Sequence, residues 1–242
     1  MKMKQLTVAA FTLLLTVSCT EKKQDFPFRN PDLPIEERIE DLLSRLTPEE
    51  KVGQMMHETP AIERLGIPPY DWWNEALHGV ARAGQATVFP QAIGMAATFD
   101  DEAVLRTFTM VSDEARAKYH HYQANNEYDR YKGLTFWTPN INIFRDPRWG
   151  RGMETYGEDP YLTTQMGVAV TKGLQGDDTN YFKTHACAKH YAIHSGPEWN
   201  RHEYNAEATP RDLYETYLPA FEALVKQGNV QEVMCAYNRF EG

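Results

Sequence analysis

The stretch LTFWTPNINIFRDPRWGRGMETYGEDPYLTTQMGVAVTKGLQG, residues 134–176, places an apolar run, a polar loop and an amphipathic helix in succession. Leu134–Trp137 predicts a strand, and Asp159-Pro160 predicts the start of a helix with apolar residues at three-to-four spacing. Further along, His185–Tyr191 and Glu232–Tyr237 predict two more strands, each separated from the last by one helix. Strands that alternate with single helices favour a parallel sheet in an α/β fold.

Caps and apolar spacing predict the other helices. They begin at Ile35, at Thr47-Pro48, after Asp100, and at Thr209-Pro210 with a kink near Pro219 and an end at Gly228. Val88-Phe89-Pro90 and the segment that leads to Trp72-Trp73 are weaker strand candidates. In a parallel sheet of this kind, reactive side chains stand at the carboxyl ends of the strands.

Composition and charge restrict the class of protein. Of 242 residues, 42% are hydrophobic and 24% are charged, which is typical of a soluble globular chain. The net charge is -9; without Lys2 and Lys4, residues from 19 onward carry 23 − 34 = −11. An acidic chain without a basic cluster repels phosphate backbones, so no nucleic-acid partner is expected. The length is slightly short for an α/β barrel, which typically needs about 250 residues.

The first residues have the layout of an export signal. Lys2 and Lys4 precede the apolar stretch from Leu6 to Val17, and Ser18-Cys19 follows. We expect a lipoprotein-type signal peptide at 1–18, lipidation of Cys19 and a polar tether at 19–34. Thr16 stands where such signals usually have leucine, and the alternative is a non-lipidated signal that is cut nearby. The expected location is the periplasm or the outer membrane of a bacterium, with membrane contact only through the lipid.

Neither a disulfide framework, a metal nor a cofactor is expected. Cys187 and Cys235 lie in apolar strand-like runs and are predicted to be small buried residues of the core. The four downstream histidines do not have zinc-ligand spacing; they are His185, His190, His194 and His202. No glycine-rich phosphate loop joins a strand to a helix, which argues against a nucleotide cofactor.

Polar and aromatic side chains follow the predicted strands, near all five tryptophans. They are Trp72 to Glu75, His78, Asn140, Asn142, Arg145 to Glu154, Lys189-His190, His194 and Tyr237-Asn238. Sugars need this mixture, because hydroxyls take charged hydrogen-bond partners and C–H faces lie against aromatic rings. Structural alternatives exist for each residue: Glu75 could pair with an arginine, and Arg148 and Arg151 with Asp146 and Glu154.

Several of these segments, in this order, resemble the N-terminal domain of glycoside hydrolase family 3. The matching motifs are Leu46–Lys51, Pro139–Arg151, Tyr156–Leu162, Ala188–Tyr191 and Met234–Asn238. Trp72–Val80 resembles the β-xylosidase-like branch, where glucosidase-like members carry an aspartate-glycine-proline segment. The resemblance implies an incomplete (β/α)8 TIM-type barrel over 35–242.

The resemblance also implies an activity and a set of substrate-binding residues. The activity is that of a retaining exo-acting β-glycosidase, of β-xylosidase or β-glucosidase type, on oligosaccharides from plant polysaccharides. Arg151, Lys189 and His190 would bind hydroxyls of the first sugar, and Tyr237 would line that subsite. Glu75 would replace the aspartate that holds ring hydroxyls in glucosidase-like members.

The two carboxyl groups of retaining chemistry are not assigned to this chain. By resemblance, the nucleophile lies beyond Gly242 and the acid/base in a second domain, so the C-terminal remainder of the protein is an expected partner. We therefore expect a fragment that is inactive by itself. The alternative is a non-catalytic, membrane-anchored glycan-binding module or an inactive truncated product, and a histidine-dependent metalloenzyme ranks last.

Overall fold

The computed structural model describes residues 26–242. The signal peptide predicted at 1–18, Cys19 and the tether up to residue 25 lie outside these residues. The chain divides into two compact units, up to Lys51 and from Val52 to Gly242. Within 26–242, no helix combines the length and the apolar character needed to cross a bilayer.

The described part of the first unit is built on the helix α1 (Ile35–Arg45). The 3-10 turn η1 (Pro27–Arg29) lies in the range predicted as a tether and contacts α1. There the Asp41 carboxylate accepts the backbone N–H of Phe28 at 3.1 Å and two bonds from Arg45 at 2.9 and 2.7 Å. The short helix α2 (Pro48–Gly53) begins at the predicted capping box, in which Thr47 and Glu50 exchange hydrogen bonds.

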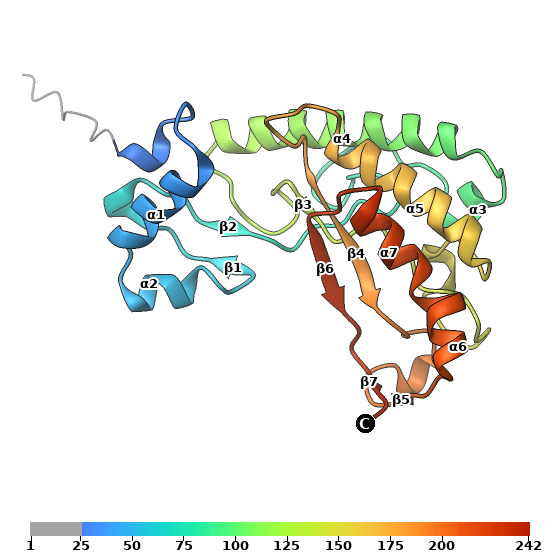
Figure 1. The fold of residues 1–242 in the computed structure, drawn as a ribbon. Coiled ribbons are helices and arrows are strands. Elements are labelled where there is room, and N and C mark those ends of the chain that lie inside the picture. The colour runs from blue at the N-terminus through green and yellow to red at the C-terminus, as the bar shows by residue number, and fades with distance from the viewer. Residues whose placement is uncertain (1–25) are drawn as a thin grey trace, which may run out of the picture. The chain divides into compact units, whose positions relative to one another are not determined.

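The second unit contains the predicted parallel sheet, in the order β3-β4-β6 (Figure 1). Its strands are β3 (Thr135–Phe136), β4 (His185–Tyr191) and β6 (Glu232–Cys235). Thr135 pairs with His185, and Ala188 with Val233, in parallel register. Residues 186–190 are buried, as expected for a strand with both faces covered. The α/β class predicted from the sequence is confirmed.

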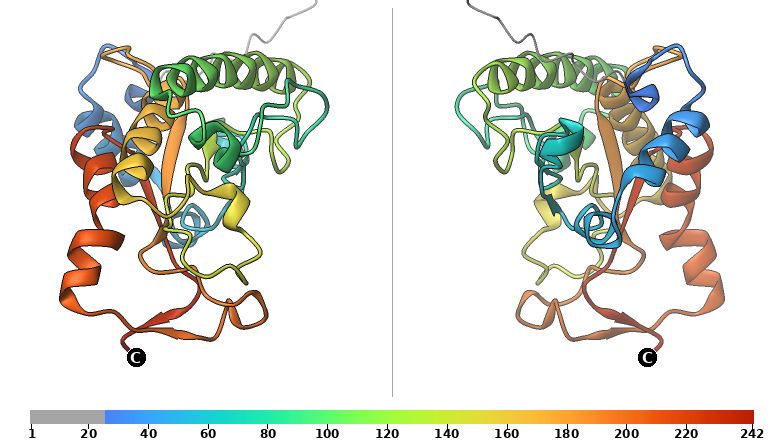
Figure 2. Two further views of the ribbon diagram at one scale, coloured as in Figure 1. Left: turned by 90° about the vertical axis from the view of Figure 1, so that its right-hand side faces the viewer. Right: turned by 90° about the vertical axis from the view of Figure 1, so that its left-hand side faces the viewer.

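Helices cover this sheet (Figures 1 and 2). α4 (Asp101–Ala124) packs on α5 (Pro160–Gln175), and α5 packs on β4 and on α7 (Pro219–Lys226). The predicted N-caps Asp100 and Asp159 each accept a backbone N–H, at 2.7 and 2.6 Å. The apolar stripes of α4, α5 and α7 enter the core, whereas α1 has no buried residue. The fully buried members of these stripes include Phe108, Val111, Val170, Leu174 and Leu224.

The last predicted helix, from Thr209-Pro210, is interrupted where expected. It begins as α6 (Pro210–Asp212), continues as the π-helical turn η5 (Leu213–Tyr217) and resumes as α7 at Pro219. Pro219 has no N–H to continue the ladder, which accounts for the break. The remaining helices are short: η2 (Glu63–Leu65), α3 (Ala92–Ala96), η3 (Gly152–Glu154) and η4 (Glu198–Asn200).

The structure differs from the sequence prediction at the two weaker strand candidates. β2 (Tyr70–Asp71) precedes Trp72-Trp73 but pairs antiparallel with β1 (Glu58–Thr59), outside the parallel sheet. The chain then runs beside β3, since the N–H of Trp137 donates to the Asn74 carbonyl at 2.9 Å. Val88–Pro90 is a loop and not a strand, because Pro90 lacks a donor and Phe89 is bonded back to His78. A last small pair is β5 (Asn205–Ala206) with β7 (Arg239–Phe240).

Of the two cysteines within residues 26–242, only one belongs to the core. Cys187 is buried in the central strand β4, as predicted, whereas Cys235 is exposed and its predicted burial is wrong. β6 is an edge strand of the described sheet, and exposed Val233 and Cys235 alternate with half-buried Glu232 and Met234. An apolar run therefore predicted the strand correctly but not which face is covered.

The contact between α4 and α5 gives a stability prediction. A Cβ on Gly173 would lie 2.8 Å from the Leu105 carbonyl oxygen and 2.8 Å from the Phe108 Cβ, whereas one on helical Gly94 would meet nothing nearer than 3.9 Å. Gly173→Ala should therefore lower the free energy of unfolding by about 1–3 kcal/mol through overpacking. The matched variant Gly94→Ala should be neutral or stabilising by up to about 1 kcal/mol. Denaturant titration of both variants checks this, and equal effects would contradict it.

Candidate functional site

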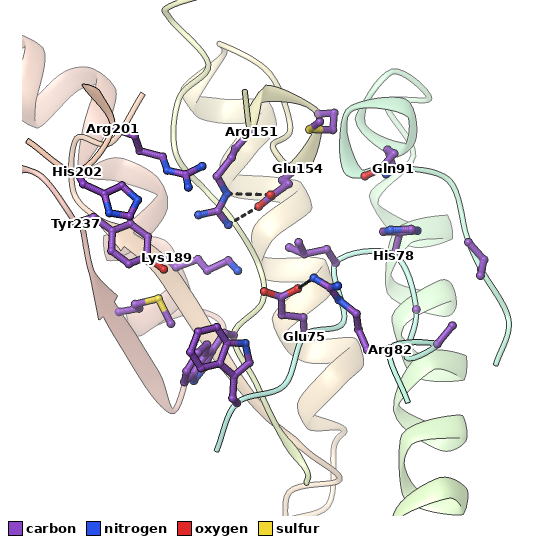
Figure 3. A pocket seen from close by; sticks show the side chains of 18 residues that line it. Glu75, His78, Arg82, Gln91, Arg151, Glu154, Lys189, Arg201, His202 and Tyr237 are labelled. Atoms are coloured by element: carbon purple, nitrogen blue, oxygen red, sulfur yellow. Dashed lines mark hydrogen bonds and ion pairs between the residues drawn. The ribbon is translucent and has the colours of Figure 1, made fainter. Parts of the chain in front are cut away.

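A polar cavity of about 750 Å³ opens at the carboxyl ends of the parallel strands. Its charged lining residues are Glu75, Arg82, Arg151, Glu154, Lys189 and Arg201 (Figure 3). Trp73, Trp137 and Tyr237 supply aromatic surface. Its volume lies in the range of small-molecule sites. Four of the five predicted substrate-binding residues thus line one cavity: Glu75, Arg151, Lys189 and Tyr237.

Lys189 is the most buried charged side chain of the cavity, with 2% of its surface exposed. It stands near the end of β4 and extends toward Glu75 and Arg151 (Figure 3). Burial lowers the pKa of Lys189 to about 8, although the carboxylates of Glu75 and Glu154 act in the opposite direction. Its ammonium group makes no hydrogen bond within the described residues, so its donors are available to a bound molecule.

Arg151 and Glu154 form a half-buried pair near Lys189. The Arg151 guanidinium donates to both carboxylate oxygens of Glu154, at 2.9 and 2.6 Å. Burial opposes the charge of Glu154, but Arg151 and Lys189 outweigh it and lower the pKa of this carboxyl below its ordinary value. The ion pair that the structural alternative predicted for Arg151 is therefore present. Arg148 pairs with Asp146 at 2.7 Å as well, but its side chain is 59% exposed and the pair is not the buried one that was predicted.

Glu75 is paired as well, with an arginine that the sequence did not indicate. Arg82 donates to one carboxylate oxygen of Glu75 at 2.9 Å, and the other oxygen has no partner within the described residues. Arg82 belongs to the loop 77–91, which is fixed by hydrogen bonds from side chains of α4. There Lys118 donates to the carbonyls of Ala83 and Gln85, and Tyr122 donates to Ala83 at 2.9 Å.

His190 lies behind the cavity and not on its wall. Its side chain is fully buried, and burial beside Arg151 and Lys189 pushes its pKa far below the ordinary value. In the neutral ring, Nδ1 donates to Oδ1 of Asn142 at 2.9 Å and Nε2 accepts from Nη1 of Arg151 at 3.0 Å. Asn142 also donates to the His190 carbonyl at 2.8 Å. His190 is thus placed to orient Arg151, and the predicted direct contact with a sugar stays a prediction.

The side of the cavity near β6 is formed by stacked rings. Tyr237 lies parallel to His202, with centroids 5.1 Å apart and planes at 6°. Behind them, His194 is fully buried and bonded through Nδ1 to Asn238 at 2.8 Å. His202 and Arg201 come from the loop after β4 and were not among the predicted site residues. The one sequence feature that could have indicated them is their place in a polar segment that follows a predicted strand.

The sequence suggested that all five tryptophans lie near the site, but not all of them do. Trp73 and Trp137 line the cavity 4.9 Å apart, whereas Trp149 is buried against Phe144 and Trp199 is 75% exposed. Across residues 26–242, no three histidine, cysteine, aspartate or glutamate side chains are grouped to hold a metal.

Sequence comparison assigns this arrangement to a family. The profile of the glycosyl hydrolase family 3 N terminal domain matches residues 45–242. The chain belongs to glycosyl hydrolase family 3. It is 54% identical over 234 residues to a xylan 1,4-beta-xylosidase of Xylanibacter ruminicola, covering 95% of this chain and 27% of that protein. It is 43% identical to beta-xylosidase/alpha-L-arabinofuranosidase 2 of Medicago sativa subsp. varia, covering 90% of this chain and 29% of that protein.

Solved structures of family 3 enzymes share the fold. A GH3 exo-beta-xylosidase in complex with a xylobiose aziridine activity based probe superposes with a TM-score of 0.79 at 34% identity, over 88% of this chain and 28% of that one. The Bifidobacterium adolescentis GH3 beta-glucosidase gives 0.69 at 28% identity, over 83% and 27%. The predicted barrel class is confirmed, and the chain spans less than a third of these family 3 relatives.

The setting of Lys189 predicts a measurable titration. In lysine-labelled protein followed by carbon NMR, its side chain should titrate near pH 8, and Glu75→Gln should move the midpoint lower, because the Glu75 carboxylate favours the charged amine. Lys189→Arg identifies the resonance, and Glu102→Gln on the surface of α4 is the control. An ordinary midpoint near 10.4, or no response to Glu75→Gln, would contradict the burial argument.

Proposed function

We propose that the complete gene product carrying this chain is a retaining exo-β-xylosidase that removes xylose from non-reducing ends of oligosaccharides. The observation that carries the proposal is the buried, unpartnered ammonium of Lys189 beside the free oxygen of Glu75 in a cavity with aromatic walls. A cation and a carboxylate at close quarters hold neighbouring hydroxyls of a sugar, and the rings of Trp73 and Trp137 suit its C–H face.

The residues have distinct roles in this proposal. Lys189 and Glu75 bind hydroxyls directly, Tyr237 lines the same subsite, and Arg151 contributes the N–H groups that Glu154 and His190 leave free. His190 acts through Arg151 in this arrangement, with Asn142 fixing its ring. Xylose is proposed over glucose because the two relatives described above are named as xylosidases.

Glu75 and Glu154 are not proposed as the carboxylates that break the glycosidic bond. Retaining hydrolysis uses a nucleophile and a proton-donating acid about 5–5.5 Å apart. Both cavity carboxylates are held by arginines, and a lowered pKa keeps Glu154 ionised and unable to donate a proton. The catalytic pair is therefore proposed to come from other residues of the protein.

Hydrolysis of 4-nitrophenyl β-xyloside by the complete gene product tests the proposal. Lys189→Ala should lower kcat/KM roughly 10- to 150-fold, since a hydrogen bond to a charged group is worth about 1.5–3 kcal/mol. The exposed Lys172→Ala on α5 is the matched control and should change neither kcat/KM nor the melting temperature. Parallel assays with β-glucoside and α-arabinofuranoside identify the sugar.

A second candidate follows from the pairing of both cavity carboxylates. A non-catalytic module that only binds glycans would show xylobiose binding by calorimetry, lost in Lys189→Ala, without turnover of any glycoside. That result would replace the xylosidase proposal, whereas turnover that Lys189→Ala leaves unchanged would remove Lys189 from the subsite.

Export and anchoring through Cys19 are also proposed, on the sequence of residues 1–19. In a bacterial host, the wild-type protein should sediment with membranes and be released by detergent, because acyl chains anchor it. Cys19→Ser should shift it to the soluble fraction or leave the signal uncut, while Ser18→Ala is the control. Membrane association of Cys19→Ser protein from which the signal has been cut would overturn the lipid anchor.

A further inference from the structure

Trp199 is a large aromatic side chain that does not line the cavity. It lies in the turn η4 (Glu198–Asn200), between β4 and β5, and 75% of it is exposed. Single exposed apolar residues are common and need no explanation by themselves. Trp199 differs because its ring and its backbone are both held in place.

Arg148 covers one face of the Trp199 ring. The guanidinium carbon lies 5.2 Å from the ring centroid, within the range of cation–π contacts. Arg148 is itself fixed by Asp146, which accepts its Nε at 2.9 Å, its Nη2 at 2.7 Å and its backbone N–H at 2.9 Å. The ring therefore has one face against a fixed cation and the other available.

The turn that carries Trp199 is joined to the Arg148 loop. The Glu198 carboxylate accepts the N–H of Gly150 at 3.0 Å, and the Glu198 N–H donates to the Arg148 carbonyl at 3.2 Å. A Cβ on Gly150 would lie 2.8 Å from this carboxylate, so a larger residue there would displace the Glu198 side chain. Figure 2 shows the loops after β3 and β4 side by side.

Both segments continue directly into the cavity wall. Arg148 is three residues before Arg151, and Trp199 is two residues before Arg201, which donates to Glu198 at 2.7 Å. Because successive Cα atoms are about 3.8 Å apart, the Trp199 Cα lies within roughly 8 Å of that of Arg201. The Arg148–Trp199 pair does not line the cavity itself, but each member is only two or three residues from a residue of its wall.

We propose that the free face of Trp199 is an outer subsite that stacks on the sugar following the one held in the cavity, on the leaving-group side of the bond. This inference rests on the proposed function, because an exo-acting enzyme encloses one terminal sugar and the rest of the chain must leave past the rim. The ligand class is a β-linked oligosaccharide of two or more xylose units, whose C–H faces match an aromatic ring that already has Arg148 on its other face.

Substrates of different length test the outer subsite in the complete gene product. Trp199→Ala should raise KM for xylobiose and xylotriose about three- to tenfold, leave methyl β-xyloside unchanged, and be largely rescued by Trp199→Phe. Tyr161→Ala, which removes a 72% exposed ring from α5, is the matched control. Equal changes for short and long substrates, or none, would overturn the subsite.

Two further outcomes separate this inference from the proposed function. If wild type hydrolyses nothing, calorimetry of xylotriose against methyl β-xyloside decides: a preference for xylotriose that Trp199→Ala abolishes supports the subsite, and its absence overturns it. If Trp199 in the complete protein resists oxidation by N-bromosuccinimide both with and without xylotriose, another part of the protein covers the ring, which also overturns it.

Discussion

The burial of the Lys189 ammonium at the end of β4 is the constraint on which the site depends. A charge with 2% exposure is costly unless it is compensated. Glu75 and Glu154 supply that compensation, and each is in turn held by an arginine, Arg82 or Arg151. The cavity is therefore a set of interdependent charges, and removing any one of them changes the electrostatic environment of the others.

A second layer of hydrogen-bonded groups holds these charges in position. Asn142 fixes the His190 ring, which receives a hydrogen bond from Arg151, and burial keeps that ring uncharged beside two cations. On the opposite side, Lys118 of α4 fixes the loop that carries Arg82. The helices that cover the sheet thus also determine the geometry of the cavity, through hydrogen bonds to loop backbone.

Local signals predicted the elements well, because caps and apolar spacing act over a few residues: β4 has its predicted bounds, and Asp100 and Asp159 cap their helices. The position of reactive residues at strand ends followed from the parallel topology. What could not be read from the chain depends on contacts between distant segments. Arg82 and Arg201 reach the cavity from irregular loops, and the buried ring of His190 is bound by Asn142, 48 residues earlier.

The charged side chains that line the cavity have a net positive charge, although the protein as a whole is acidic. Arg82, Arg151, Arg201 and the amine of Lys189 face only two carboxylates, so the lining has an excess of two positive charges while the whole chain carries -9. A third carboxylate brought to this place would be attracted and would have its pKa lowered. Such a group would be ionised at neutral pH without any base to deprotonate it. The same excess makes small anions natural competitors for the space.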